Sequence, residues 1–342
     1  LRVVPRVRGS RTGFTRPGTA TMPPMVEFTP SKRVASLKPS VTIALTNRAK
    51  DLLAQGVDVL GFAAGEPDFD TPERIKTAAI NALRAGQTKY APTFGDLETR
   101  GVVATKLEQE NGIHGLSAEH IAISAGGKHS LFVAMQVLLD EEHARGENDA
   151  YEVIIPTPAW VSYRPLAELA GGEVVEIETT PESGFRMTPE QLEAAITPRS
   201  RILMLNSPSN PCGTMYTEQQ LRELADVVAD KATVAPNLLI ITDEIYEKIV
   251  YGKDEQGESL RHFSIGSVPS VAERTITVNG LSKAFAMTGW RVGYAGMPGT
   301  NGKRFIKAMA AMQGQMTTNI TSFVYPAIRT ALTECATEVE EM

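Results

Sequence analysis

The strongest constraint on the fold is a regular alternation of short β-rich runs with longer helical patterns between residues 120 and 295. The β-rich runs lie at 120–124, 153–156, 173–178, 201–205, 238–242, 275–278 and 292–295. Helical patterns separate most of them, at 127–139, 162–170, 189–196 and 217–230. Because crossover helices join parallel strands in such chains, we predict an α/β fold with a mostly parallel central sheet and helices on both faces.

Residues suited to ligand chemistry follow five of these predicted strands. In chain order they are Gly126 with Gly127, then Trp160, Asn210, Asp243 with Tyr246, and Lys283. Ligands of open α/β sheets bind at the carboxyl ends of the strands, so all five sets are expected at one edge. A single set could arise by chance, but five on one edge predict a binding site.

Lys283 lies on a predicted turn after the strand at 275–278, and Arg291 follows eight residues later. A buried lysine amine can lose its proton more easily than its ordinary pKa of about 10.4 allows, and it then attacks an aldehyde. Taken alone, this stretch is more typical of a solvated surface loop. The other four sets reverse that preference.

Gly126 and Gly127 stand where a predicted strand passes into a predicted helix, an arrangement that favours phosphate. The surrounding residues match neither a Walker A loop nor a GxGxxG fingerprint. The predicted ligand is therefore a phosphate other than a nucleoside triphosphate or a dinucleotide. A glycine pair that serves only packing remains the alternative.

Pyridoxal 5′-phosphate (PLP) needs an amine, a phosphate site, a stacking ring and a carboxylate, and it is the cofactor that this set predicts. Asp243 is expected to pair with the pyridine nitrogen, while Tyr246 and Asn210 bind the phenolic oxygen. The remaining expected contacts are Gly126, Gly127 and Arg291 with the phosphate, and Trp160 with one face of the ring, unless Trp160 is simply a core residue.

Several motifs carry a resemblance to a known family. They are Asn206-x-Pro-x-Asn210-Pro-x-Gly213, Asp243-Glu-Ile-Tyr246 and the run Ser282-Lys283-Ala-Phe-Ala-Met-Thr-Gly-Trp-Arg291. Together they resemble the fold-type I, class I aminotransferases. Two further stretches, 65–72 and 157–163, are similar to those of bacterial-type aspartate aminotransferases and of plant plastid glutamate/aspartate-prephenate aminotransferases. The resemblance extends from about residue 33 to the end of the chain.

The resemblance implies a homodimer in which Tyr90 reaches the cofactor phosphate of the other subunit. It also implies that Gly65 lies near the substrate carboxylate and that Lys128 holds a distal carboxylate. Thr71 would add a hydroxyl donor, and Trp160 and Asn210 would contact both cofactor and substrate. Lys128 has two plainer alternatives, a solvated lysine or a further cofactor contact, and Thr71 is also a candidate N-cap before Pro72.

The function that follows is a PLP-dependent, ping-pong amino-acid transaminase with Lys283 in Schiff-base linkage to the cofactor. Its expected substrates are L-aspartate and 2-oxoglutarate, with prephenate as a further option. The alternatives are a kynurenine-type aminotransferase, a β-lyase or an inactive truncated product. The family continues beyond the position of Met342 to a carboxylate-binding arginine, and Cys212 replaces the usual threonine of its motif.

The resemblance and the composition together suggest four regions. Residues 1–33 are basic, hydroxyl-rich and poor in acids, as in organellar transit segments, so a plastid is expected ahead of a mitochondrion. An untargeted disordered tail or a start at Met22 or Met25 are the alternatives, with a cytoplasmic protein as the result. The other regions are an arm and the first part of a small domain at 34–65, a large PLP-binding domain at 66–318, and the start of an incomplete small domain at 319–342.

Charge and composition exclude other classes. A formal net charge of −6 argues against general binding to nucleic acid or to an anionic membrane surface. No run approaches the length of a transmembrane helix. No HExxH or CxxC spacing accompanies the five histidines and two cysteines, so no metal site is expected.

Overall fold

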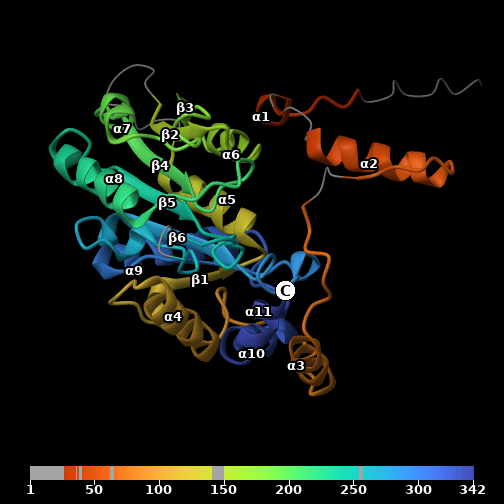
Figure 1. Ribbon diagram of the computed structural model, residues 1–342. Coiled ribbons are helices and arrows are strands. Elements are labelled where there is room, and N and C mark those ends of the chain that lie inside the picture. The colour runs from red at the N-terminus through yellow and green to blue at the C-terminus, as the bar shows by residue number, and fades with distance from the viewer. Residues whose placement is uncertain (1–26, 36, 38–40, 62–64, 141–149, 254–256) are drawn as a thin grey trace, which may run out of the picture. The chain divides into compact units, whose positions relative to one another are not determined.

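The computed structural model describes residues 27–35, 37, 41–61, 65–140, 150–253 and 257–342. The chain forms two units, Leu1–Lys38 and Pro39–Met342. In the first, the short helix α1 (Lys32–Ala35) is described, whereas most of the predicted transit segment, at 1–26, lies outside the described residues. The second unit holds the other described helices and all of the described strands (Figure 1).

The second unit is built on a seven-stranded mixed sheet with the order β1-β7-β6-β5-β4-β2-β3. Neighbouring strands are parallel from β6 to β3, and β7 runs antiparallel to both β6 and β1. The prediction of a mostly parallel central sheet is thus confirmed. The strands are β1 (Ile121–Ser124), β2 (Glu152–Thr157), β3 (Glu173–Glu178), β4 (Ser200–Asn206), β5 (Leu239–Asp243), β6 (Thr275–Gly280) and β7 (Gly293–Gly296).

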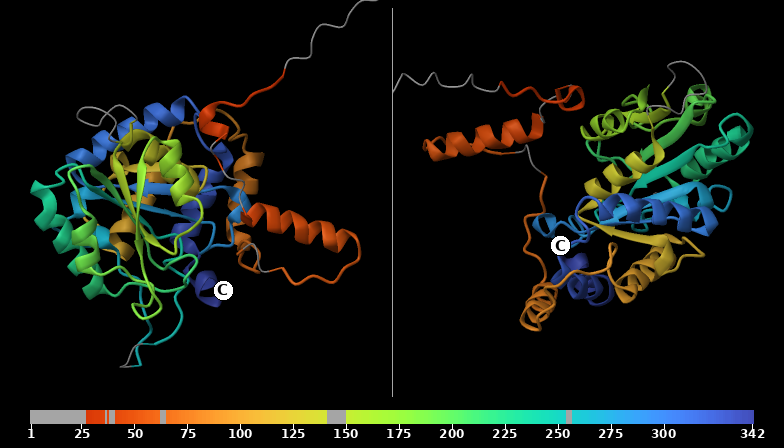
Figure 2. Two further views of the ribbon diagram at one scale, coloured as in Figure 1. Left: turned by 90° about the horizontal axis from the view of Figure 1, so that it is seen from above. Right: turned by 180° about the vertical axis from the view of Figure 1, so that it is seen from behind.

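Helices cover both faces of this sheet, as the two views in Figure 2 show. On one face, α5, α6 and α9 pack on the strands, and on the other α7 and α8 do so. A third group, α3, α4 and α10, packs around β1 and β7. The described helices of this unit are α2 (Val41–Ala54), α3 (Glu73–Arg84), α4 (Leu97–Asn111), α5 (Gly127–Leu138), α6 (Tyr163–Leu169), α7 (Pro189–Ala195), α8 (Glu218–Asp230), α9 (Gly299–Gly314), α10 (Tyr325–Glu334) and α11 (Ala336–Glu341).

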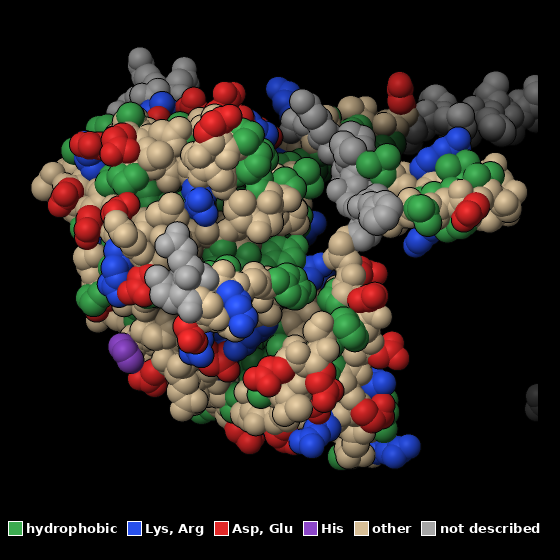
Figure 3. All heavy atoms as spheres, viewed as in Figure 1, with side chains coloured by type: hydrophobic (Ala, Val, Ile, Leu, Met, Phe, Trp, Pro, Cys, Tyr) green, Lys and Arg blue, Asp and Glu red, His purple; other side chains and the backbone are tan. Residues whose placement is uncertain are grey.

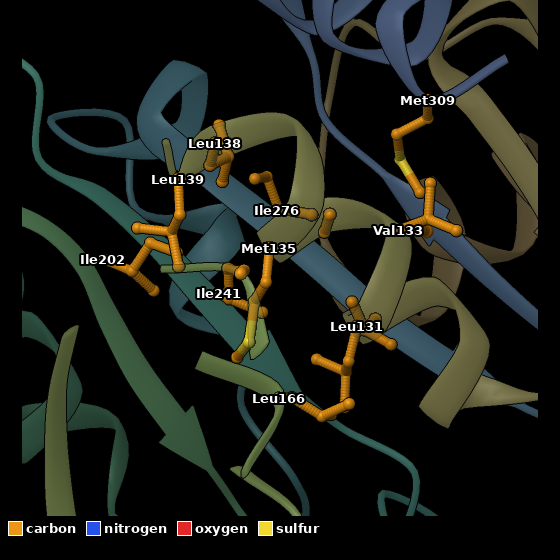
Figure 4. Packing of buried hydrophobic residues seen from close by; sticks show 14 of the residues in the cluster. Leu131, Val133, Met135, Leu138, Leu139, Leu166, Ile202, Ile241, Ile276 and Met309 are labelled. Carbon is orange, nitrogen blue, oxygen red and sulfur yellow. The ribbon is translucent and has the colours of Figure 1, made fainter. Parts of the chain in front are cut away.

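The two faces are built by alternate residues of the same strands. Ile202 and Ile241 join the core beneath α5, whereas their chain neighbours Leu203 and Ile240 join the core beneath α8. Figure 4 shows Leu131 and Met135 of α5 among the strand residues of the first core. A strand that is buried on both faces is a continuous apolar run in the sequence, and such runs made these strands predictable.

The antiparallel strand β7 brings three segments together at the ligand edge of the sheet. Gly293 pairs with Ser124 at the end of β1 and with Gly280 at the end of β6. A Cβ atom on Gly293 would come within 2.3 Å of the Gly126 carbonyl carbon, so only glycine allows this approach. The turn after β1 therefore lies against the start of β7.

Two local predictions are wrong. The short apolar run 57–62 also predicts a strand, but residues 57–61 have no regular structure, and Phe62 lies outside the described residues. The N-cap of α3 is Pro72, with no side-chain cap, because the Thr71 hydroxyl donates instead to the Ala286 carbonyl at 2.7 Å. Residues 57–61 pair with none of the described strands, and the Thr71 hydroxyl is taken up by a tertiary contact, so neither local pattern forms the predicted structure.

Acidic and basic side chains are interspersed over the face shown in Figure 3. In the described part of the chain, no helix combines the length and the apolar character needed to cross a bilayer.

Candidate functional site

A cavity of about 1090 Å³ opens at the carboxyl edge of the sheet. Four predicted site residues line it, namely Gly65, Asn210, Tyr246 and Lys283. Asp243 ends β5 and is buried just behind Tyr246. A second group at the same edge is linked by contacts among its members, which are Gly126, Lys128, Trp160 and Arg291. The structure therefore places these residues in two adjoining groups.

Lys283 lies on the turn that follows β6. Its Nζ donates a hydrogen bond to the Gly65 carbonyl and lies 5.7 Å from the centre of the Tyr246 ring. Burial lowers the pKa of Lys283, and the nearby Glu66 carboxylate partly opposes this effect. The amine is therefore deprotonated more readily than that of a solvated lysine, as a nucleophile requires.

Asp243 is a buried carboxylate with two hydrogen-bond donors. The Tyr163 hydroxyl donates to Oδ2 at 2.8 Å, and the Ile245 N–H donates to Oδ1 at 3.3 Å. Burial raises the pKa of Asp243 to about 6, although both hydrogen bonds work in the opposite direction. The group is thus ionised at neutral pH and can accept from a cationic N–H.

Asn206 holds a hydrogen-bonded pair, Asn210 and Tyr246, beside Asp243. Asn206 donates to the Asp243 carbonyl at 2.8 Å and accepts from the Asn210 N–H at 2.7 Å. Asn210 Nδ2 in turn donates to the Tyr246 hydroxyl at 3.1 Å. Burial raises the pKa of Tyr246, so the hydroxyl keeps its proton at neutral pH. Asn210 and Tyr246 together can bind an oxygen atom of a ligand.

The start of α5 and Arg291 lie together at this edge of the sheet. Gly126 has a φ of 95°, and a Cβ on it would come within 2.5 Å of Arg291 Nη2. Arg291 itself has a φ of 57°, and its Nη1 donates to the Thr288 carbonyl at 2.7 Å. Gly127 then begins α5. A guanidinium beside a helix N-terminus is a site for a doubly charged anion such as phosphate.

Lys128 lies over an aromatic ring in the structure. Its Nζ is 4.7 Å from the centre of the Trp160 ring, within cation–π distance. Burial, followed by the positive charge of Arg291, lowers the pKa of Lys128. Trp160 also packs edge-on against Tyr163, with ring centres 5.2 Å apart. Lys128 thus adds a second positive charge near Arg291 at the start of α5.

The other two predicted residues have distinct positions. Thr71 accepts a hydrogen bond from Trp290 Nε1 at 3.1 Å, in addition to its bond to Ala286. Its hydroxyl is therefore already engaged with the loop that carries Lys283. Tyr90 lies between α3 and α4 with 91% of its surface exposed.

Two residues of the site were missed at first. Tyr163 donates directly to Asp243, and Asn206 ties β4 to β5 through the Asp243 carbonyl. Both stood within recognised motifs but received no role. Asn206 had a usable signal, because it is the last residue of β4 and so lies at the carboxyl end of a strand, whereas Tyr163, the first residue of α6, had none.

The donor set suits one kind of ligand. It combines a desolvated amine, a buried carboxylate, a fixed amide–phenol pair and a guanidinium beside a helix start. A flat heterocycle with a protonated nitrogen, an aldehyde, a phenolic oxygen and a phosphate would satisfy each of these groups.

Sequence comparison gives the class to which this fold and site belong. The chain belongs to the family "aminotransferase class I and II", whose family model matches residues 57–342. The chain is 44% identical over 313 residues to the aspartate aminotransferase of Geobacillus stearothermophilus, covering 91% of this chain and 74% of the relative. It is 45% identical over 303 residues to the aspartate/prephenate aminotransferase of Thermus thermophilus, covering 89% and 72% respectively.

Solved structures agree with this assignment. The aspartate aminotransferase of Thermus thermophilus with maleate superposes with a TM-score of 0.81 at 42% identity. The match covers 92% of this chain and 75% of that structure. The predicted class I aminotransferase, with its fold, is therefore confirmed.

Proposed function

We propose that the protein is a PLP-dependent aminotransferase that moves the amino group of L-aspartate to 2-oxoglutarate, with prephenate as a further amino acceptor. The observation that carries this proposal is the placement of a desolvated Lys283 and a buried Asp243 at one edge of the sheet. The printed names of the two relatives, aspartate and aspartate/prephenate aminotransferase, support the choice of substrates.

PLP, when bound, supplies an aldehyde for the amine and a ring that withdraws electrons. Asp243 would keep the ring nitrogen protonated, and Asn210 with Tyr246 would hold the phenolic oxygen. Arg291 with the start of α5 would bind the phosphate. Trp160 would cover one face of the ring, and Lys283 Nζ would move the proton at the substrate Cα as general base and acid.

We assign substrate recognition to the residues around this centre. Gly65, whose carbonyl contacts Lys283 Nζ, lies where the α-carboxylate is expected. Lys128 is the candidate for the distal carboxylate of aspartate, glutamate or prephenate, because it lies at a helix start that also favours an anion. Thr71 is assigned as a hydroxyl donor for prephenate, and to donate it must give up its bond to the Ala286 carbonyl, because a hydroxyl has only one proton.

The test of the function is covalent trapping together with activity. Borohydride treatment of the protein with PLP is expected to fix the cofactor on Lys283, as read by peptide mass spectrometry. Lys283→Ala is expected to lose aspartate turnover by several orders of magnitude, since nucleophile and proton carrier vanish together. Lys307→Ala, at an exposed position on α9, is the matched control. Trapping on a different lysine would contradict the assignment.

We also propose a homodimer with a shared site, in which Tyr90 contacts the cofactor phosphate of the partner subunit. Its 91% exposure supports this role, since an isolated subunit leaves the ring in solvent.

A plastid address is the last part of the proposal. It rests on the composition of residues 1–33, which contain several arginines and one acid, Glu27. A fusion of these residues to a fluorescent protein is expected to enter plastids of plant cells. Uniform cytoplasmic fluorescence would contradict the address and leave the enzymatic proposal intact.

A further inference from the structure

Behind the turn that carries Asp243 and Tyr246 lies a second cluster of charged residues, buried and outside the reaction described above. Two members, Glu244 and Glu247, belong to that same turn. The others come from α4 and from the segment before β6, and they are Lys106, Asn111, His262 and Ser264. Glu244 has no exposed surface at all.

The carboxylate of Glu244 is surrounded by donors. Its Oε1 accepts from Ser264 Oγ at 2.7 Å and from Thr242 Oγ1 at 3.2 Å. Its Oε2 accepts from Asn111 Nδ2 at 2.9 Å and lies 3.1 Å from His262 Nε2. Each oxygen therefore has two polar neighbours.

Glu247 is held in the same way from α4. Lys106 Nζ donates to its Oε1, and Asn111 Nδ2 donates to its Oε2 at 2.7 Å. Asn111 thus bridges both glutamates, while Lys106 also donates to the Asn111 side-chain oxygen at 2.7 Å. Lys106 and Glu247 reach the wall of the cavity that contains Lys283.

Basic and acidic side chains face one another in this cluster. Burial by itself would lower the pKa of His262, but the carboxylates of Glu244 and Glu247 outweigh it and raise that pKa. Burial would raise the pKa of Glu247, but Lys106, His262 and Asn111 together outweigh it and lower that pKa. Two carboxylates thus face the Lys106 cation and the His262 ring, whose protonation they favour. The lysine and the donors on every carboxylate oxygen make a metal ion a poor fit, although two glutamates and a histidine converge here.

We infer that Lys106, Asn111, Glu244 and Glu247 are positioning residues that fix the turn 243–247 so that Asp243 and Tyr246 meet the cofactor. Residues 243 and 246 face the proposed ring site, and residues 244 and 247 face the cluster. The turn is also tied to β6 by the Glu244 N–H, which donates to the Val278 carbonyl at 2.8 Å. This inference rests on the proposed function.

The test changes the anchor and leaves all of the proposed cofactor contacts in place, although Lys106 itself reaches the wall of the cavity. Lys106→Met removes the cation that holds Glu247, and Lys106→Arg keeps a cation at the same place. We expect Lys106→Met to raise the dissociation constant of PLP by about tenfold or more and to lower kcat similarly, with the KM for aspartate little changed. Lys106→Arg should restore most of both losses. Lys303→Met, which breaks an exposed pair with Glu119, is the matched control.

A double variant covers the case in which Lys106→Met does not fold. Lys106→Met with Glu247→Gln removes one charge of each sign, so no glutamate is left buried without its partner. We expect it to fold and still to bind PLP about tenfold more weakly than wild type. A folded single or double variant with the wild-type PLP dissociation constant and kcat would overturn the inference, even if its melting temperature fell. Wild-type protein that binds no PLP would contradict the proposed function itself, and this inference with it.

Discussion

The proposed site needs Asp243 in its ionised form, and ionisation of this buried carboxylate lowers the stability of the folded protein. The pKa of Asp243 is about 6, against 3.8 for an ordinary aspartate, so the folded protein holds a proton that the unfolded chain has already released. Between about pH 4 and pH 6 the unfolding free energy therefore falls as the pH rises. The shift corresponds to about 3 kcal/mol, reached above pH 6.

Asp243→Asn removes this titration while keeping the shape. The unfolding free energy of each protein is measured with denaturant and without PLP. The value for the variant minus that for wild type is expected to rise by about 3 kcal/mol from pH 4 to pH 7. Its turnover should nevertheless fall by about a thousandfold or more, because the charge opposite the ring nitrogen is gone. A stability difference that does not change with pH would show that Asp243 titrates normally. Near-normal turnover would make Asp243 a purely structural residue.

Lys128 is the residue on which substrate choice depends in this proposal. Lys128→Ala is expected to lower kcat/KM for aspartate and glutamate by roughly 2–4 kcal/mol, the result of leaving a carboxylate without its partner. Alanine, which has no distal carboxylate, should change little. Steady-state kinetics with both amino acids measures the difference. Equal losses for both would assign Lys128 to the cofactor instead.

At the scale of elements, the turn from β1 into α5 determines whether a phosphate can bind. Gly126→Ala places a Cβ at a φ of 95° and within 2.5 Å of Arg291 Nη2. We expect a loss of about 1–3 kcal/mol in stability and a PLP dissociation constant raised by about tenfold, since the guanidinium has to move. Calorimetry of unfolding and a PLP titration measure the two effects.

A second glycine serves as the control for this experiment. Gly101 lies within α4, and a Cβ on it would meet no atom within 4 Å. Gly101→Ala should therefore stabilise the protein by about 0.5–1 kcal/mol and leave PLP binding unchanged. If Gly126→Ala behaved like Gly101→Ala, the proposed phosphate cradle would be wrong.

The elements of the sheet were predictable because their signals are local. A fully buried strand is a continuous apolar run, and β4, predicted at 201–205, spans Ser200–Asn206. The run at 57–62 looks similar, but residues 57–61 form no strand, and a run alone does not supply a pairing partner. The edge at which the site residues collect was predictable as well, since it follows from strand direction.

The cluster behind the site was not predictable in the same way. Lys106 and Asn111 look like part of an ordinary polar face of α4, yet both are buried. Their partners, Glu244 and Glu247, lie far along the chain, so no spacing in the sequence links them. Thr71 failed as an N-cap for the same reason, because Ala286 and Trp290 compete for its hydroxyl.

For the whole molecule, the proposed dimer makes each site depend on two chains. In a mixture of Lys283→Ala and Tyr90→Ala subunits, one site of each mixed dimer regains both Lys283 and the partner subunit's Tyr90. Such hybrids are expected to recover up to about half of the wild-type activity per site, as in other shared-site oligomers. Activity measured after mixing and refolding the two inactive or weakened proteins tests this.

The separate proteins provide the controls for that experiment. Tyr90→Ala alone should bind PLP more weakly, and Lys283→Ala alone should be inactive. If mixing gave only the average of the two parents, Tyr90 would not act across subunits.

The position of β7 also determines the stage of synthesis at which the proposed cofactor site can form. Among the described strands β1 pairs only with β7, which leaves the ribosome long after it. Until β7 inserts between β1 and β6, the turn at Gly126 has no Arg291 beside it. Such long-range pairing forms late in folding. If PLP is the cofactor, as proposed, we expect it to bind only after β7 has closed this edge of the sheet.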